Sequence, residues 1–227
     1  MDDISADPKQ GQRAALLAVA RRTIEDSGPE VLRARALAAE AGTSTQALYT
    51  LFGGMPGLIE AVVADGFAEF ARHVAEVPES EDPIADFFAK GWAFGEWALA
   101  RPHLYRLMFG LTGGGLRQHA GLEMAVSGAV ANSPEAQGAL DVLVRSMSRV
   151  KESGRIEPVD PIVAAGQFLS ATHGFVLLEI AGAFGSSGDG LDIVRSLAVN
   201  LMVGLGDSRE AATASLRAVE SSKAGLA

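Results

Sequence analysis

A short run of hydroxyl and amide side chains between residues 44 and 50 has the residue types that read nucleic-acid bases. The run contains Ser44, Thr45, Gln46, Tyr49 and Thr50. Hydroxyl groups bind phosphates and base edges, and a glutamine amide can bind adenine through two hydrogen bonds. Each residue also has a structural interpretation, since Ser44 suits a helix N-cap, the threonines suit solvent positions and Tyr49 suits the edge of a core. Residue type alone therefore leaves both roles open.

These residues fall in the second of two short helices that are predicted on either side of Gly42. Helices are expected over residues 33–41 and 45–51, and the pair Gly53-Gly54 ends the second one. The apolar residues expected to hold the two helices together are Leu37, Ala38, Ala41, Leu48 and Phe52. Two short helices joined by a tight turn have helix-turn-helix geometry, in which the second helix can lie in a DNA major groove with its polar side exposed.

Charge is unevenly distributed along the chain. The 227 residues carry a net charge of −9, which opposes a polyanionic partner. Residues 8–52 nevertheless hold six basic and four acidic residues, a local charge of +2: Lys9, Arg13, Arg21, Arg22, Arg33 and Arg35 against Glu25, Asp26, Glu30 and Glu40. This pattern is typical of a DNA-reading module joined to an acidic regulatory domain, although ordinary surface charge can also produce it.

Nearly every segment with a readable period has the helical one, which predicts an all-α fold. Besides the two short helices, we expect helices over residues 9–26, 56–77, 82–100, 122–130, 135–153, 161–184 and 191–206, with a glycine-rich loop over 111–120. After Ser208 the composition turns to alanine, serine and charge, which indicates a weak helix or disorder. The expected domains are a helix-turn-helix domain at 8–54, a larger helical domain at 55–207 and a tail at 208–227.

The first of these domains resembles the N-terminal domain of the TetR family of regulators. The family pattern A-x-x-x-G-V-S-x-x-x-L-Y-x-x-F is matched at Ala38, Gly42, Ser44, Leu48, Tyr49 and Phe52. The resemblance implies operator contacts by Ser44, Thr45, Gln46, Tyr49 and Thr50, and a phosphate contact by Arg35. Three residues depart from the pattern: Thr43, Leu51, and Met55, which stands where the family has a phosphate-binding lysine.

The C-terminal half more faintly resembles the branch of the family named for a Trp-His-Gly element. Residues 100–110 and 171–182 carry this resemblance, with Thr172 in place of the tryptophan. The family implies an effector pocket and a four-helix dimer interface made by the last two long helices. Residues expected at the pocket are Phe88, Trp92, Trp97, Met108, Phe109, Met147, Phe168, His173 and Phe175, with His103, Tyr105 or His173 as polar groups. The same residue types also suit an ordinary core.

Several other classes of protein are disfavoured by the sequence. The chain has no cysteine, which excludes disulfides and cysteine-ligated metal centres and fits a reducing cytoplasm. The four histidines lack metal-ligand spacing, and no hydrolase or phosphate-binding motif occurs. Residues 162–184 have the length of a membrane span, but their polar side chains favour a helix buried by protein. We therefore expect no enzyme, cofactor, metal or membrane association.

The resulting hypothesis is a cytoplasmic, homodimeric repressor that binds a pseudo-palindromic operator in double-stranded DNA. A small hydrophobic or aromatic effector would release it from that operator. An activator or a constitutive DNA binder has the same sequence features. The alternative from another class is a helical carrier or enzyme for apolar small molecules that does not bind DNA.

Overall fold

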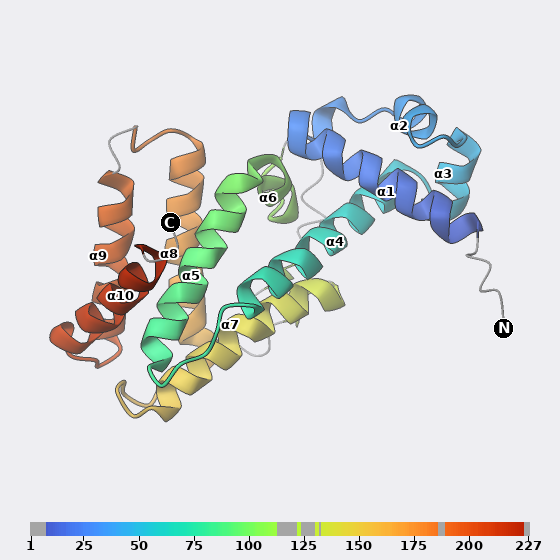
Figure 1. Ribbon diagram of the computed structural model, residues 1–227. Helices are drawn as coiled ribbons and strands as arrows, with labels where there is room; N and C mark the ends of the chain where they lie inside the picture. Colours follow the sequence, from blue (N-terminus) through green and yellow to red (C-terminus); the bar gives the residue numbers. More distant parts are fainter. Residues whose placement is uncertain (1–7, 113–121, 124–129, 132, 186–188, 225–227) are drawn as a thin grey trace. The chain divides into compact units, whose positions relative to one another are not determined.

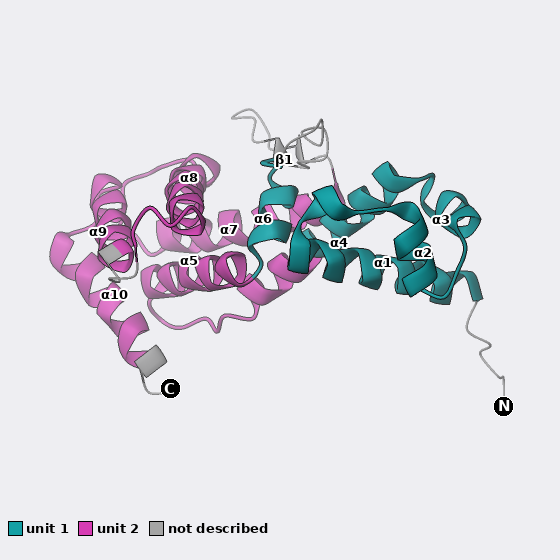
Figure 2. Cartoon of the chain, turned by 90° about the horizontal axis from the view of Figure 1, so that it is seen from above, with its two compact units in different colours: residues 1–67, 101–122 teal, residues 68–100, 123–227 magenta. Residues whose placement is uncertain are grey.

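The protein is built almost entirely from α-helices (Figure 1). The computed structural model describes residues 8–112, 122–123, 130–131, 133–185 and 189–224. Apart from two strands of two residues each, β1 (Leu122–Glu123) and β2 (Val130–Ala131), the regular elements in these residues are helical. The predicted all-α class is confirmed. The chain forms two compact units, residues 1–67 with 101–122 and residues 68–100 with 123–227 (Figure 2).

Unit 1 is a small helical domain organised around its first helix. Its elements are α1 (Pro8–Ser27), the 3-10 turn η1 (Pro29–Val31), α2 (Ala34–Glu40), α3 (Thr45–Phe52), α4 (Met55–Ala75) as far as Phe67, and α6 (Pro102–Met108). Helix α1 packs against α2, α3 and α6. Leu16, Ala20 and Ile24 are spaced four residues apart and are fully buried, so one stripe of α1 forms the centre of this core.

Unit 2 is a helical bundle with α5 at its centre. Its elements are the end of α4 from Ala68, α5 (Pro83–Ala100), α7 (Pro134–Glu152), α8 (Pro161–Ile180), α9 (Asp189–Gly204) and α10 (Arg209–Ala224). Helix α5 packs against α7, α8 and α10, while α9 packs against α8 and α10. Because α5 is enclosed by helices from distant parts of the sequence, most of its side chains are buried. Its side chains therefore form the centre of the core of unit 2.

Two predicted helices differ from those observed by more than two residues at an end. Helix α8 ends at Ile180 rather than 184, because Gly182 takes a φ of +74° and the Ala183 amide donates to the Leu178 carbonyl at 2.9 Å. The helix predicted over 122–130 is wrong at both ends, where the described residues are the strands β1 and β2. A nine-residue helix is marginal without caps, and the valines there favour extended backbone. The loop predicted over 111–120 lies outside the described residues beyond Thr112.

Most of the segment predicted as a weakly structured tail forms helix α10. The Ser208 hydroxyl accepts a hydrogen bond from the Ala211 amide at 3.1 Å and caps the start of the helix. Ala212, Leu216 and Val219 are buried on one face, which packs against α5 and α9. This helix is therefore an integral part of unit 2.

A network of polar side chains fixes the start of α5. The carboxylate of Asp86, which is only 4% exposed, accepts hydrogen bonds from the amide and hydroxyl of Ser80 and from Arg149 at 2.9 Å. Burial raises the pKa of Asp86, but the hydrogen bonds from Ser80 and the guanidinium of Arg149 outweigh it and lower that pKa below 3.8. Arg155 similarly joins Asp82 at 3.0 Å to Asp207 at 2.7 Å. The network thus connects α5 with α7 and the start of α10.

Candidate functional site

The turn between α2 and α3 is a glycine-dependent helix end. Gly42 has a φ of +64°, a left-handed conformation that favours glycine. Its amide donates to the Ala39 carbonyl at 3.2 Å, and the Thr43 amide donates to the Ala38 carbonyl at 2.8 Å. These two bonds form a Schellman motif, which satisfies the last carbonyls of α2. The chain therefore leaves α2 abruptly and can begin α3 at Thr45.

Helix α3 is held by its apolar side and exposes its polar side. The Ser44 hydroxyl accepts a hydrogen bond from the Ala47 amide at 3.1 Å, so Ser44 is the N-cap. Leu48 is fully buried, whereas Gln46 and Tyr49 are exposed. At its other end the helix stops at Gly53, which is left-handed. The backbone and core thus present one polar face of two helical turns to solvent.

The polar side chains of this face differ in how free they are to bind. Tyr49 is 57% exposed, and in the described part of the chain its hydroxyl has no hydrogen-bond partner. The Thr50 hydroxyl donates to the Gln46 carbonyl at 2.9 Å, which leaves it only as an acceptor. Ser44 is engaged as a cap, and Thr45 is half-buried. Gln46 and Tyr49 are therefore the best placed to reach a base edge.

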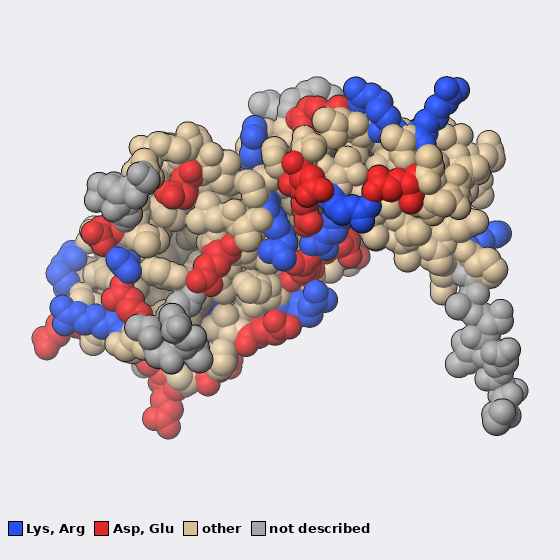
Figure 3. Space-filling view, turned by 45° about the horizontal axis from the view of Figure 1, so that its top comes forward, with Lys and Arg blue, Asp and Glu red and all other residues tan. Residues whose placement is uncertain are grey.

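The basic residues of unit 1 divide into paired and available ones. Arg21 and Arg22 form ion pairs with carboxylates, namely those of Glu25, Asp65 and Glu40. The guanidinium of Arg13 lies 5.1 Å from the centre of the Phe52 ring, in a cation–π contact. Arg35 is exposed and has no ion pair among the described residues. Figure 3 shows Lys and Arg side chains that project from this unit. Among the predicted DNA contacts, Arg35 carries a charge that no carboxylate of the described residues neutralises.

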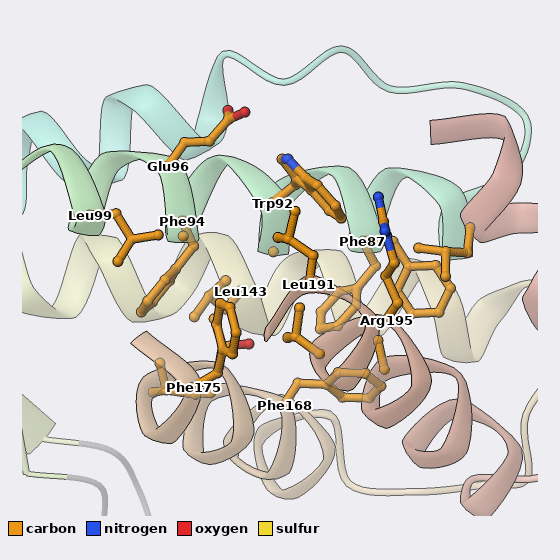
Figure 4. A pocket seen from close by; sticks show the side chains of 18 residues that line it. Phe87, Trp92, Phe94, Glu96, Leu99, Leu143, Phe168, Phe175, Leu191 and Arg195 are labelled. Atoms are coloured by element: carbon orange, nitrogen blue, oxygen red, sulfur yellow. The ribbon is translucent and has the colours of Figure 1, made fainter. Parts of the chain in front are cut away.

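Unit 2 contains a pocket of about 140 Å³ between α5, α7, α8, α9 and α10 (Figure 4). Aromatic rings make up much of its wall. Phe87 and Phe168 meet edge to face with ring centres 4.9 Å apart, and Phe175 and Trp92 also line it. A partly open, mostly apolar cavity with few polar groups is a usual form of a small-molecule site.

Two glycines of α5 create much of the space on one side of the pocket. Gly91 and Gly95 line it one helical turn apart, and a Cβ at either position would meet no atom within 4 Å. Glycine in a helix interior costs about 0.5–1 kcal/mol relative to alanine, so it usually has a packing or functional reason. Neither glycine was predicted to line the pocket, although a glycine inside a helix is a signal in the sequence that could have identified them.

Arg195 at the pocket forms ion pairs, but its buried Nε makes no hydrogen bond among the described residues, because the nearby Glu220 carboxylate lacks hydrogen-bond geometry. The guanidinium of Arg195 lies 5.4 Å from the centre of the Trp92 ring, 3.0 Å from the Asp192 carboxylate and 2.7 Å from that of Glu220. Figure 4 shows the carboxylate of Glu96 pointing away from the rings of Phe87, Phe168 and Phe175. Among the described lining residues, the one hydroxyl belongs to Thr172.

The pocket brings together four of the nine predicted ligand-binding residues, namely Phe88, Trp92, Phe168 and Phe175. Trp97 lies outside it, because its indole donates to Glu69 at 3.1 Å and its ring packs edge-on against Phe70 at 5.3 Å. Three other predicted residues are core or belong to unit 1: Met147, Met108 and Phe109. Ligand contact stays a prediction for all nine residues.

The expected polar groups also lie outside the pocket. His103 and Tyr105 belong to unit 1, where burial raises the pKa of Tyr105. His173 is half-buried on α8, and burial lowers its pKa, so it is neutral at pH 7. Its neighbour Thr172, at the position where the chain departs from the Trp-His-Gly pattern, lines the pocket instead. The described residues contain no cluster of three or more histidine or carboxylate groups suited to a metal ion.

Both parts of this arrangement match models of one protein family. Residues 16–62 match the model described as bacterial regulatory proteins, tetR family, and residues 87–201 match the tetracyclin repressor-like C-terminal domain. The chain belongs to the TetR family. Members of this family are DNA-binding transcriptional regulators, so the predicted resemblance is confirmed.

Solved structures share the TetR fold over most of the chain. A protein of unknown function from Rhodococcus sp. RHA1 is 25% identical, with a TM-score of 0.69 over 91% of this chain and 100% of that one. RolR in complex with resorcinol is 16% identical, with a TM-score of 0.62 over 92% and 94%. The fatty acid degradation regulator FadR from Bacillus halodurans is 15% identical, with a TM-score of 0.64 over 90% and 100%. No curated protein matches the chain.

The N-terminal family match covers the whole helix-turn-helix, whereas the C-terminal match leaves out one part of the pocket wall. The N-terminal match includes the whole of α2, the glycine turn and α3. The C-terminal match includes every pocket residue from Phe87 to Ala198 but stops before α10. Leu216 of α10, which also lines the pocket, is therefore a part of the wall that the TetR family model does not cover.

Proposed function

We propose that this TetR-family chain is a cytoplasmic, homodimeric repressor that leaves its operator when a small hydrophobic or aromatic effector binds. The observation that carries the proposal is helix α3, whose Leu48 is fully buried while Gln46 and Tyr49 remain exposed. Major-groove readout requires a helix that is packed against the domain by its apolar side and exposes its polar side. A separate apolar pocket in unit 2 supplies a place for an effector.

In this proposal residues 8–54 are the DNA-binding domain. The Gln46 amide reads a base edge, Tyr49 and Thr50 reach bases or phosphates, and Arg35 neutralises a phosphate. Ser44 and Thr45 lie at the start of α3, where the remaining backbone amides also attract phosphate oxygens. Residue 55 is methionine, so this chain makes one ionic contact per subunit fewer than a relative with lysine there.

Helix α8 supports the proposed dimer. It is long and apolar enough to span a membrane, yet only 33% of its most apolar window is buried in the chain. The bent pair α3–α4 reaches the length and hydropathy of a membrane span only when the two helices are taken together. Leu178 on α8 and Leu191 and Ile193 on α9 are between 41% and 50% exposed. A second copy that covers this surface would form a four-helix interface and would pair two DNA-binding domains with two operator half-sites.

The effector is proposed to act by favouring a conformation that binds DNA poorly. Coupling of about 1–3 kcal/mol between the two sites is enough for a useful switch. The structure of RolR was solved with resorcinol, and FadR is named as a regulator of fatty acid degradation. Small organic effectors of this general kind are compatible with the apolar pocket of the present chain.

A footprint on the DNA upstream of the chain's own gene tests this function, together with selection of bound sites from genomic fragments. We expect one protected pseudo-palindrome, and we expect Arg35→Ala to weaken binding to all DNA while Gln46→Ala weakens binding to that sequence alone. Arg217→Ala removes an exposed arginine of α10 and serves as the charge-matched control. Absence of any specifically protected site from both experiments would overturn the proposal.

A further inference from the structure

We propose that the pocket of unit 2 selects an uncharged, hydroxylated compound with a single aromatic ring, and that Thr172 is the residue that recognises its hydroxyl group. The binding step is inferred from the pocket itself. Only the statement that this compound is the effector rests on the proposed function above. The inference follows from the size of the pocket, the ion pairs of its arginine and one threonine hydroxyl at its wall that makes no hydrogen bond within the described residues.

The inner volume of the cavity gives room for about one ring. Its volume is about 140 Å³. An engineered apolar cavity of roughly 150 Å³ in another protein binds benzene, so a cavity of this size holds one six-membered ring. A second fused ring or a long acyl chain would need the wall to move. Gly91 and Gly95 provide part of the existing space because they have no side chains.

The lining favours an aromatic compound without a charge. Phe87 and Phe168 already pair edge to face, and Phe175 offers a further ring to a planar ligand. An anionic ligand would have to compete for Arg195 with the carboxylates of Asp192 and Glu220, which lie 3.0 and 2.7 Å from it. A cation would meet the same guanidinium. Because two carboxylates already lie next to this guanidinium, we infer that a charged ligand would gain less from Arg195 than its own desolvation costs.

The hydroxyl of Thr172 differs from those of the other threonines that lie in helix interiors. The hydroxyls of Thr23, Thr50 and Thr213 donate to the carbonyl four residues earlier at 2.7–2.9 Å. Thr172 makes no such bond, and no other partner for its hydroxyl occurs in the described part of the chain. Thr172 is half-buried at the pocket wall. Its donor and acceptor capacity is therefore available to a ligand hydroxyl.

Calorimetric titration of the purified full chain tests this inference with four small probes. Phenol and toluene have nearly the same shape and differ in the hydroxyl, benzoate adds a negative charge, and 1-naphthol adds a ring. We expect phenol to bind most tightly, toluene next, and benzoate and 1-naphthol at least tenfold more weakly than phenol. Tighter binding of benzoate or of 1-naphthol than of phenol would overturn the inferred ligand class.

The role of Thr172 is tested by Thr172→Val, which removes the hydroxyl and keeps the shape of the side chain. We expect the affinity for phenol to fall roughly 3- to 10-fold, the worth of one net hydrogen bond, while the affinity for toluene changes less than about twofold. Thr213→Val makes the same change on α10 outside the pocket and should leave both affinities unaltered. Equal losses for phenol and toluene, or none for phenol, would refute the assigned role.

The same probes separate this inference from the proposed function. A gel shift with the operator, with and without phenol, reports whether binding releases DNA. Phenol that binds as described without releasing DNA would reject the effector role and leave the ligand class standing. Specific operator binding by a chain that captures none of the four probes would reject the ligand class and leave the DNA-binding function standing.

Discussion

Replacing Gly95 of α5 by alanine should make the protein more stable and its pocket less able to bind. Gly95 lies inside a helix, has no left-handed backbone, and would place a Cβ with no atom within 4 Å. Alanine therefore costs no steric strain and reduces the conformational freedom of the unfolded chain. The expected gain is about 0.4–1 kcal/mol in the free energy of unfolding. For a chain of this length, that gain raises Tm by about 1–4 °C.

The same methyl group reduces the space available to a ligand. Gly95 lines a cavity of only about 140 Å³, so the new Cβ occupies space that a ring would use. Overpacking of a filled site costs about 1–3 kcal/mol, which corresponds to roughly 5- to 100-fold in affinity. Phenol and toluene should lose affinity alike, since the change affects volume and leaves the Thr172 hydroxyl in place.

Thermal and urea unfolding measure the first effect, and titration with phenol and toluene measures the second. Gly138→Ala is the matched control, because Gly138 lies in α7, has an open Cβ position and does not line the pocket. It should raise stability by a similar amount and leave both affinities unchanged. If Gly95→Ala destabilised the protein, or bound both probes as tightly as the wild type, the assignment of this glycine to ligand space would be refuted.

Three further predictions concern the turn, the polar network and the DNA surface. Gly42→Ala should lower the free energy of unfolding, measured by urea titration, by about 1–2 kcal/mol, the cost of a left-handed alanine. The new Cβ would meet no other atom, so the loss comes from the backbone conformation and not from a clash. Asp86→Asn should lower stability at pH 7 by about 1–3 kcal/mol. Since the folded-state pKa of Asp86 is depressed, the carboxylate's contribution is complete above 3.8 and is lost as pH falls through the folded value, so unfolding curves of the asparagine variant should depend less on acid in that range. Met55→Lys should steepen the dependence of log affinity on log salt by about 0.9 per subunit, as measured by operator titration at several salt concentrations.

The helix boundaries near the N-terminus could be predicted because local residues determine them. Ser44 caps α3, Gly53 ends it, and the observed bounds differ from the prediction by one residue. The short-range pattern of Gly42, Leu48 and Tyr49 also identified the family. In each case the physical cause lies within a few residues of the effect, so the sequence contains it directly.

Helix α10 could not be predicted with the same certainty because its partners are distant. Its composition alone indicates a weak helix. The Ser215 hydroxyl donates to the Asp82 carboxylate at 2.6 Å across 133 positions of sequence, and Leu216 packs at the pocket. Tertiary contacts of this kind stabilise a helix whose own propensity is marginal.

The pocket was only partly predictable because residue type does not show which face of a helix a residue occupies. Trp92 and Trp97 lie on one helix five positions apart, yet Trp92 lines the pocket and Trp97 packs against Phe70. Large aromatic and sulfur-containing side chains were predicted to line the pocket, whereas much of the space on one side comes from two glycines. Selecting the face of α5 required the positions of α7, α8 and α9.

The most direct test of the account measures operator affinity and ligand binding in the same Tyr49→Ala variant. Tyr49 is exposed on α3 in unit 1, whereas every pocket residue belongs to unit 2. We predict that operator affinity falls at least tenfold while the affinity for phenol stays within twofold of wild type. Unchanged operator affinity, or loss of phenol binding together with it, would contradict a regulator that reads DNA through α3 and senses its ligand elsewhere.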